Sequence, residues 1–107
     1  MTVPFKEGDI IRHFKRDIVT SEERQKNMYL YKVLAVGMHT ETKERMLVYQ
    51  ALYFPFGVFV RPLEMATEVV RGKAEYAMYG DMIQEHRLEL CDDKEYDNYP
   101  NVIKQEV

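Results

Sequence analysis

The sequence is poor in cysteine, in serine and in long apolar runs. It contains one cysteine and one serine among 107 residues, and no run of about 18 apolar residues of the kind that spans a membrane. The single Cys91 cannot form a disulfide within the chain, and a reducing compartment is the simplest place for it. The amino terminus lacks the long apolar core of a signal peptide. These absences predict a cytoplasmic protein without a membrane span.

The residues that form nucleophilic and metal sites are equally scarce. Ser21 lies in a polar segment, and the acidic surroundings of Cys91 disfavour its thiolate. The three histidines, His13, His39 and His86, are far apart in sequence and show no zinc-ligand spacing. The sequence therefore predicts no metal centre, no cofactor and no serine or cysteine nucleophile.

Composition and charge indicate one folded domain. Apolar residues make up 46% of the chain and charged residues 31%, which is typical of a globular protein with a single core. The formal net charge is −3 at pH 7, and it argues against general affinity for nucleic acid. We expect one domain over residues 1–107, with its core in residues 8–70 and a C-terminal extension in residues 72–107.

Alternating apolar residues predict several strands in the first half of the chain. The polar reversal at residues 39–44 predicts a hairpin, and Gly57 is expected to take the positive φ in the next turn. Residues 16–27 are polar and are expected to form an exposed loop. The expected strands are residues 10–15, 29–38, 45–53 and 58–61.

After these strands the pattern changes to that of a helix. Pro62 suits the first position of a helix, and apolar residues then recur at helical spacing as far as Gly72, which predicts about two to three turns. Residues 99–107 fit either a last strand or a short helix. The predicted fold is mainly β: a small antiparallel SH3-like barrel or roll, with a short helix after residue 62 and an irregular or partly helical C-terminal segment.

Several strings of residues resemble those of a known family. They are GDIIRHFK (8–15), YKVL (31–34), HTET (39–42), VYQALY (48–53) and VRPLEM (60–65). Together they resemble the small bacterial domain-of-unknown-function 1653 family over residues 8–70. The resemblance implies an SH3-like β-barrel roll in a bacterial cytoplasmic protein, and it implies no reaction. The chain departs from the family pattern in its long 16–27 loop and at Met38 and Phe59.

Aromatic residues on the predicted strands and turns suggest a binding site. Tyr31, Tyr49, Tyr53, Phe56 and Phe59 fall on neighbouring strands or their turns, and small barrels use such rings to bind extended peptides or single-stranded nucleic acid. Half-buried core tyrosines would give the same pattern. Nearby arginines favour an acidic or carboxylate-bearing ligand. The expected lining is Arg12, His13, Tyr31, His39, Glu41, Tyr49, Tyr53 and Arg61.

These residues leave alternatives open. We favour a non-enzymatic binding or accessory module whose partner is a protein, a peptide or a small anionic ligand. A small enzyme could instead use His13 or His39 with Glu41 for acid–base chemistry. A module for single-stranded nucleic acid is another alternative, which the acidic balance disfavours. A purely structural oligomer is the third reading. The oligomeric state stays open.

Overall fold

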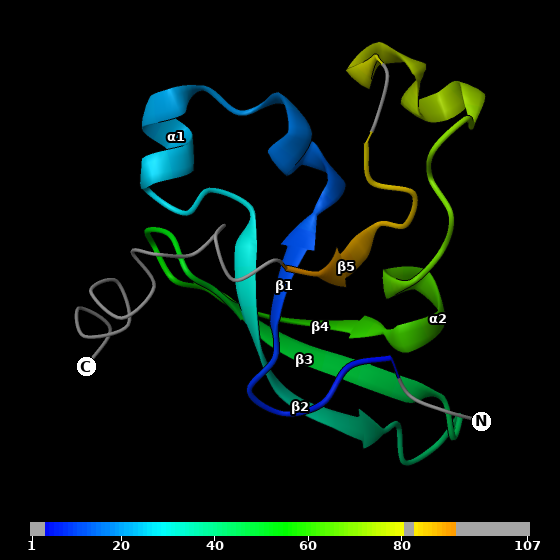
Figure 1. The fold of residues 1–107 in the computed structure, drawn as a ribbon. Helices are drawn as coiled ribbons and strands as arrows, with labels where there is room; N and C mark the ends of the chain where they lie inside the picture. Colours follow the sequence, from blue (N-terminus) through cyan, green and yellow to red (C-terminus); the bar gives the residue numbers. More distant parts are fainter. Residues whose placement is uncertain (1–3, 81–82, 92–107) are drawn as a thin grey trace.

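One antiparallel sheet forms the centre of the molecule (Figure 1). The computed structural model describes residues 4–80 and 83–91. The strand order across the sheet is β4-β3-β2-β1-β5, and the mainly β class and the predicted hairpin of β2 and β3 are confirmed. The strands are β1 (Ile10–His13), β2 (Leu30–Met38), β3 (Arg45–Ala51), β4 (Val58–Pro62) and β5 (Leu88–Leu90).

The sheet is bent and remains open. The ladders within residues 4–80 and 83–91 do not join β4 to β5, so the fold is a roll and not a closed barrel. The register of β2 against β3 shifts between Val33 and Ala35, and such an irregularity bends a strand. In Figure 1 β2 changes direction along its length, so that β1 and β5 run across the direction of β3 and β4. Because the sheet is open, β4 and β5 are its outer strands among the described residues.

Short helices occupy the connections between strands. They are η1 (Phe14–Ile18), α1 (Ser21–Gln25), α2 (Leu63–Ala66) and η2 (Ala74–Tyr79). α1 lies where an exposed loop was predicted, and it buries none of its residues. It forms because the Glu23 amide donates to the Thr20 hydroxyl while the Glu23 carboxylate accepts from the Thr20 amide, which satisfies two helix-end donors. The helix is therefore a local effect of that capping box.

The helix predicted after residue 62 is present but short. α2 begins directly after Pro62 and ends at Ala66. Beyond it the Thr67 hydroxyl donates to the Leu63 carbonyl oxygen at 2.9 Å, and Val69 forms a β-bridge with His86. The predicted helical continuation to Gly72 is therefore wrong. The predicted C-terminal strand or helix at residues 99–107 lies outside the described residues.

The two faces of the sheet bury different side chains. On the face that we call the inner face, residues from β1, β2 and β3 pack against Phe5, α2 and β5. On the other face Ile10, Leu30 and Leu52 form a smaller cluster. A third group joins Phe14 and Val70 to the rings of η2. The inner-face core contains Phe5, Ile11, Tyr31, Val33, Leu47, Tyr49, Ala51, Leu63, Ala66 and Leu88.

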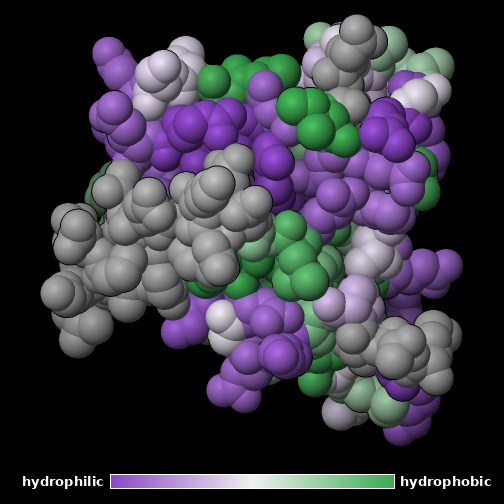
Figure 2. Space-filling model, viewed as in Figure 1, coloured by the Kyte–Doolittle hydropathy of each residue, from purple (hydrophilic) through white to green (hydrophobic). Residues whose placement is uncertain are grey.

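The exposed surface mixes both kinds of residue. Figure 2 shows a mostly hydrophilic face with hydrophobic side chains gathered near its middle. Among the described residues, no helix has the length and apolar character needed to cross a membrane. The same residues contain no group of three His, Cys, Asp or Glu side chains that could hold a metal ion.

Candidate binding site

Five aromatic side chains converge at one end of the inner face. We call Tyr29, Tyr31, Tyr49, Tyr53 and Phe59 the aromatic cluster. The Tyr31 ring lies at its centre and meets the rings of Tyr49, Tyr53 and Phe59 edge-on, with centroids 5.2, 5.7 and 6.2 Å away. The Tyr29 and Tyr53 rings are 5.9 Å apart. Edge-to-face pairs each add about 0.5–1.5 kcal/mol beyond buried area, so the rings hold one another in place.

Strand register explains how the central rings meet. Tyr49 on β3 lies opposite both Val33 of β2 and Phe59 of β4. Because side chains two residues apart share a face of a strand, Tyr31, Tyr49 and Phe59 all point to the inner face. Three adjacent strands therefore supply three adjacent rings.

Residues with a positive φ occur at two turns beside the aromatic cluster. Phe56 takes the positive φ of the turn after β3, at 61°, and Gly57 does not, which corrects the expectation for that glycine. A side chain at Gly57 would be crowded instead, because a Cβ atom there would lie 3.3 Å from the Phe59 ring. Tyr29 also has a positive φ, at 67°, a conformation that is costly for a bulky residue and that often occurs at functional sites.

Two tyrosine hydroxyls of the aromatic cluster, those of Tyr31 and Tyr53, are neutral at physiological pH. The hydroxyls of Tyr31 and Tyr53 lie 2.8 Å apart and share a hydrogen bond. Burial raises the pKa of Tyr31, with further rises from the bond to Tyr53 and from the other phenols nearby. Burial likewise raises the pKa of Tyr53. The Tyr49 side chain is only 6% exposed, yet its hydroxyl bonds to no described residue. It can donate to a ligand.

His13 borders the cluster as a neutral ring. Its centroid is 5.6 Å from that of Tyr29, and its Nδ1 accepts the Lys15 amide N–H at 3.1 Å. Burial, followed by the charges of Lys15, Arg87 and Arg61, lowers the pKa of His13 to about 3. Since Nδ1 is an acceptor, the proton of the neutral ring is on Nε2. His13 therefore presents an N–H donor and is a poor base at neutral pH.

Arg61 supplies the positive charge of this face. It lies two residues after Phe59 on β4, so both side chains point to the same side of the sheet. The residue is half-buried as a whole, and its guanidinium makes no hydrogen bond or ion pair with the described residues. Its charge nevertheless contributes to lowering the pKa values of His13 and Glu68. A partly buried charge without a partner is costly, and an anionic ligand would offset that cost.

Glu68, whose pKa is lowered in part by the charge of Arg61, already has another cationic partner. Glu68 accepts from Arg87 Nε at 3.1 Å and also from an Arg87 terminal nitrogen. Arg87 in turn donates to the Tyr76 hydroxyl at 2.6 Å and lies over that ring. The hydrogen bond to Arg87 is the main cause that lowers the pKa of Glu68. The Arg87–Glu68 pair therefore leaves Arg61 available.

The structure separates the predicted lining residues. His13, Tyr31, Tyr49, Tyr53 and Arg61 lie on the inner face, where the aromatic cluster gathers. Tyr29 and Phe59 complete it, although the expected lining omitted them. For Phe59, its alternation with Arg61 along β4 is the sequence signal that could have found it. Tyr29 precedes β2 and has no such signal.

Arg12 lies on the opposite side of β1 from His13. Its guanidinium pairs with Asp17, with the nitrogen and oxygen 2.6 Å apart. Its partner Asp17 also accepts the amide N–H groups of Ile83 and Gln84. The Arg12–Asp17 pair therefore links β1 to η1, and Asp17 links η1 to a distant segment of the chain. Arg12 does not face the aromatic cluster.

His39 and Glu41 lie in the turn between β2 and β3. His39 Nδ1 accepts the amide N–H groups of Glu41 and Thr42, each at 3.2 Å, and all three residues are exposed. His39 is eight residues beyond Tyr31 along β2, which corresponds to about 26 Å of extended chain. These two residues stabilise the hairpin turn and are remote from His13.

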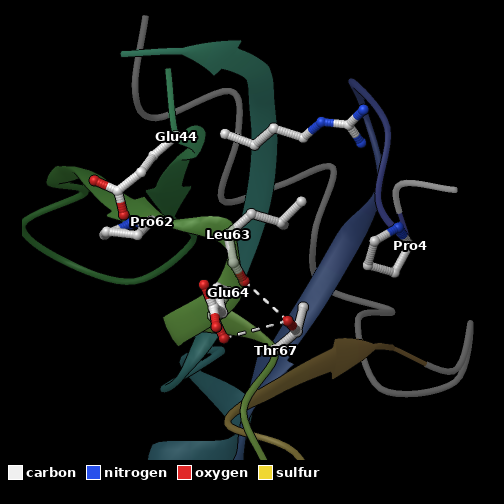
Figure 3. A pocket seen from close by; sticks show the side chains of 7 residues that line it. Pro4, Glu44, Pro62, Leu63, Glu64 and Thr67 are labelled. Atoms are coloured by element: carbon white, nitrogen blue, oxygen red, sulfur yellow. Dashed lines mark hydrogen bonds between the residues drawn. The ribbon is translucent and has the colours of Figure 1, made fainter. Parts of the chain in front are cut away.

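A separate cleft of about 590 Å³ lies beside α2. Figure 3 shows Glu44, Pro62, Leu63, Glu64, Thr67 and Pro4 around it, with the Thr67 hydroxyl bonded back to the helix. Arg45 also lines this cleft and has interactions of its own. Two glutamates make it a poor place for an anion. The surface formed by the aromatic cluster and Arg61 has the opposite charge.

Comparison with known proteins gives one match. The model of a family described as protein of unknown function (DUF1653) matches residues 9–82, which confirms the resemblance seen in the sequence. Neither the curated proteins nor the solved structures yield a match.

Proposed function

The chain belongs to this family of unknown function, and we propose that it is a non-enzymatic binding module for a carboxylate-bearing ligand. The ligand carboxylate pairs with Arg61, and its apolar body packs on the Phe59 ring, which is 46% exposed and contacts the buried rings of Tyr31 and Tyr49. One observation carries the proposal: the guanidinium of half-buried Arg61 has no ion pair or hydrogen bond among the described residues, and Arg61 shares a face with the aromatic cluster.

The polar groups around this face favour an anion over a cation. Arg61 is a permanent donor, neutral His13 presents Nε2–H, and Tyr49 has an unbonded hydroxyl. A carboxylate accepts from such groups, and an arginine fork binds its two oxygens in parallel. Aromatic walls with a few placed polar groups are typical of small-ligand sites.

The acid–base alternative lacks support in this arrangement. A histidine with a pKa of about 3 is almost fully deprotonated at neutral pH and is too weakly basic to remove protons efficiently. Its proposed partner Glu41 lies in the β2–β3 turn, beyond the far end of β2 from Tyr31. Binding therefore accounts for the site better than proton transfer does.

Benzoate and benzamide form a suitable pair of probes, because they share a ring and differ in charge. A ¹H–¹⁵N NMR titration of the wild type with benzoate is expected to shift the amide resonances of Tyr31, Tyr49, Phe59 and Arg61. Benzamide should bind at least about 10-fold more weakly, since it cannot form the charged pair. Arg61→Gln should weaken benzoate binding by about 10- to 100-fold, as expected for loss of a hydrogen bond to a charged group.

Arg71→Gln is the matched control. Arg71 is an exposed arginine that pairs with Glu85 at 3.0 Å, away from the aromatic cluster. Its removal changes the net charge by the same amount as Arg61→Gln and should leave benzoate binding unchanged. The proposal is wrong if benzoate binds Arg61→Gln as tightly as wild type, or if its shifts map to other residues.

A further inference from the structure

We infer that the free edge of β4 is a docking site for an extended acidic peptide, which adds to the sheet as a further strand and places a carboxylate on Arg61. This inference rests on the proposed function, because Arg61 is the same anion-binding group. It goes further by identifying the partner as a peptide segment and the binding mode as strand addition.

The first observation is that, among the strands of residues 4–80 and 83–91, β4 ends the sheet with an apolar edge that no other described strand covers. It is the outermost strand of the order β4-β3-β2-β1-β5. Val58, Phe59 and Val60 are consecutive and are 55%, 46% and 61% exposed. Proteins usually protect a free edge with charged side chains or with a very short strand. The opposite edge, β5, has three residues with Glu89 at its middle, whereas β4 has neither device before Arg61.

The second observation concerns the backbone of β4. The Ala51 amide donates to the Gly57 carbonyl oxygen at 2.9 Å, so these two residues are a hydrogen-bonded pair in register with the rest of the ladder. In an antiparallel ladder such pairs alternate with pairs that do not bond. Gly57, Phe59 and Arg61 therefore turn their backbone groups to β3. Val58 and Val60 turn theirs outward, where they bond to none of the described residues.

The side chains of β4 define what a docked strand must carry. All strand pairs of the described sheet are antiparallel, so we take the docked strand to be antiparallel as well. A residue opposite Arg61 shares its inner face and should be acidic, and a residue opposite Phe59 should be aromatic or apolar. Residues opposite Val60 and Val58 face the other side and should be β-branched. The matching core sequence is Glu-Val-Phe-Val.

The test uses a capped peptide, Ser-Thr-Glu-Val-Phe-Val-Thr-Ser, measured by isothermal titration calorimetry against the full chain. A version with Gln in place of Glu should bind at least about 10-fold more weakly to wild type. It should bind Arg61→Gln as tightly as the Glu peptide does. That non-additivity assigns the peptide carboxylate to Arg61.

Backbone methylation separates strand addition from side-chain binding. N-methylation of the first peptide Val removes the N–H that would donate to the Val60 carbonyl oxygen, and it should reduce affinity by about 10-fold or more. N-methylation of the peptide Phe is the control, because that residue lies opposite Phe59 and turns its N–H away from β4. If both methylated peptides bind as tightly as the parent peptide, strand addition is overturned.

A protein variant gives the complementary result. Val60→Pro removes an outward N–H without removing a bond to β3, whereas Val60→Thr keeps the N–H. We expect Val60→Pro to lose peptide binding and to keep benzoate binding, and Val60→Thr to keep both. If Val60→Pro does not fold, the methylated peptides decide the question on wild type alone.

The remaining outcomes distinguish the strand-addition inference from the proposed function. Benzoate binding through Arg61 without peptide binding would overturn the strand-addition inference and leave the proposed function intact. If wild type binds neither benzoate nor the peptide, the proposed function is overturned as well. Sedimentation equilibrium that shows a dimer in wild type and a monomer in Val60→Pro would assign the edge to a second copy of the chain, and the peptide would then be the wrong occupant.

Discussion

Two arginines of the sheet, Arg12 on β1 and Arg61 on β4, illustrate how the same residue type takes different roles. Both are half-buried, and both were expected to line the binding site. The Arg12 guanidinium is 2.6 Å from a carboxylate oxygen of Asp17, whose side chain is 4% exposed. Arg61 makes no comparable pair with the described residues. The presence of a built-in carboxylate, and not the residue type, separates a structural arginine from one available to a ligand.

The surroundings of the two arginines differ in the same way. Around Arg12, the second oxygen of Asp17 accepts two backbone N–H groups, from Ile83 and Gln84. The Gln84 amide nitrogen donates to the carbonyl oxygens of Arg12, His86 and Arg87. The bonds to Asp17 and to the Arg12 carbonyl oxygen join segments more than 60 residues apart in sequence. Around Arg61, by contrast, the Tyr49 hydroxyl has no described partner. One region uses its polar groups for stability, and the other leaves them open for binding.

The largest difference between the two regions should appear in folding stability. Asp17→Asn removes the charge that pairs with Arg12 and weakens the bonds to Ile83 and Gln84. Breaking a buried ion pair by removing one partner costs about 3–5 kcal/mol, and we expect a loss near the lower end because Asn retains one acceptor oxygen. Arg61→Gln should change the free energy of unfolding by less than about 0.5 kcal/mol, because no pair is lost. Urea unfolding at pH 7 measures both, and equal losses would contradict the comparison.

The second expected effect is a pH dependence caused by His13. Its folded-state pKa of about 3 lies below the ordinary value of 6.5, so the unfolded chain binds a proton over this range while the folded chain does not. Stability should therefore be highest above pH 6.5 and should fall as the pH drops towards 3. Between pH 7 and pH 5 the loss from this group should be about 2 kcal/mol.

His13→Asn is the matched variant for this effect. Asn can still accept the Lys15 amide N–H that His13 Nδ1 now accepts, and it is a favoured residue at a helix start. The variant should lose less stability than wild type between pH 7 and pH 5 when urea unfolding is measured at both. Parallel pH profiles would show that His13 does not titrate as its burial requires.

Local sequence pattern was sufficient for β2, β3 and β4, but it did not place β5. Alternation placed β2, β3 and β4 to within a few residues, and the polar turn at residues 39–44 paired β2 with β3. α1 follows from the capping box at Thr20 and Glu23, a signal that is present in the sequence. The predicted continuation of α2 failed because Val69 pairs with His86, a contact made 17 residues along the chain. Helical spacing could not exclude that pairing.

The binding site was harder to predict for the same reason. The strand alternation that places Tyr31, Tyr49 and Phe59 on one face is visible in the sequence. The distinction between Arg12 and Arg61 is not, because it depends on which carboxylate reaches each guanidinium after folding. The position of Tyr29 depends on a positive φ at a non-glycine residue, for which propensity gives little indication. Which strands form the outer edges of the sheet likewise depends on where β5 pairs.

The smallest expected effect separates two tyrosines of the aromatic cluster. Tyr53→Phe removes a hydroxyl that bonds to Tyr31 at 2.8 Å and should cost about 1 kcal/mol, because the partner hydroxyl is left half-buried. Tyr49→Phe removes a hydroxyl without a described partner, so its folding stability should change by less than about 0.5 kcal/mol while benzoate binding weakens. Urea unfolding and NMR titration of both variants check this pair. A Tyr49→Phe variant with reduced stability and unchanged benzoate affinity would move Tyr49 from the open region to the structural one.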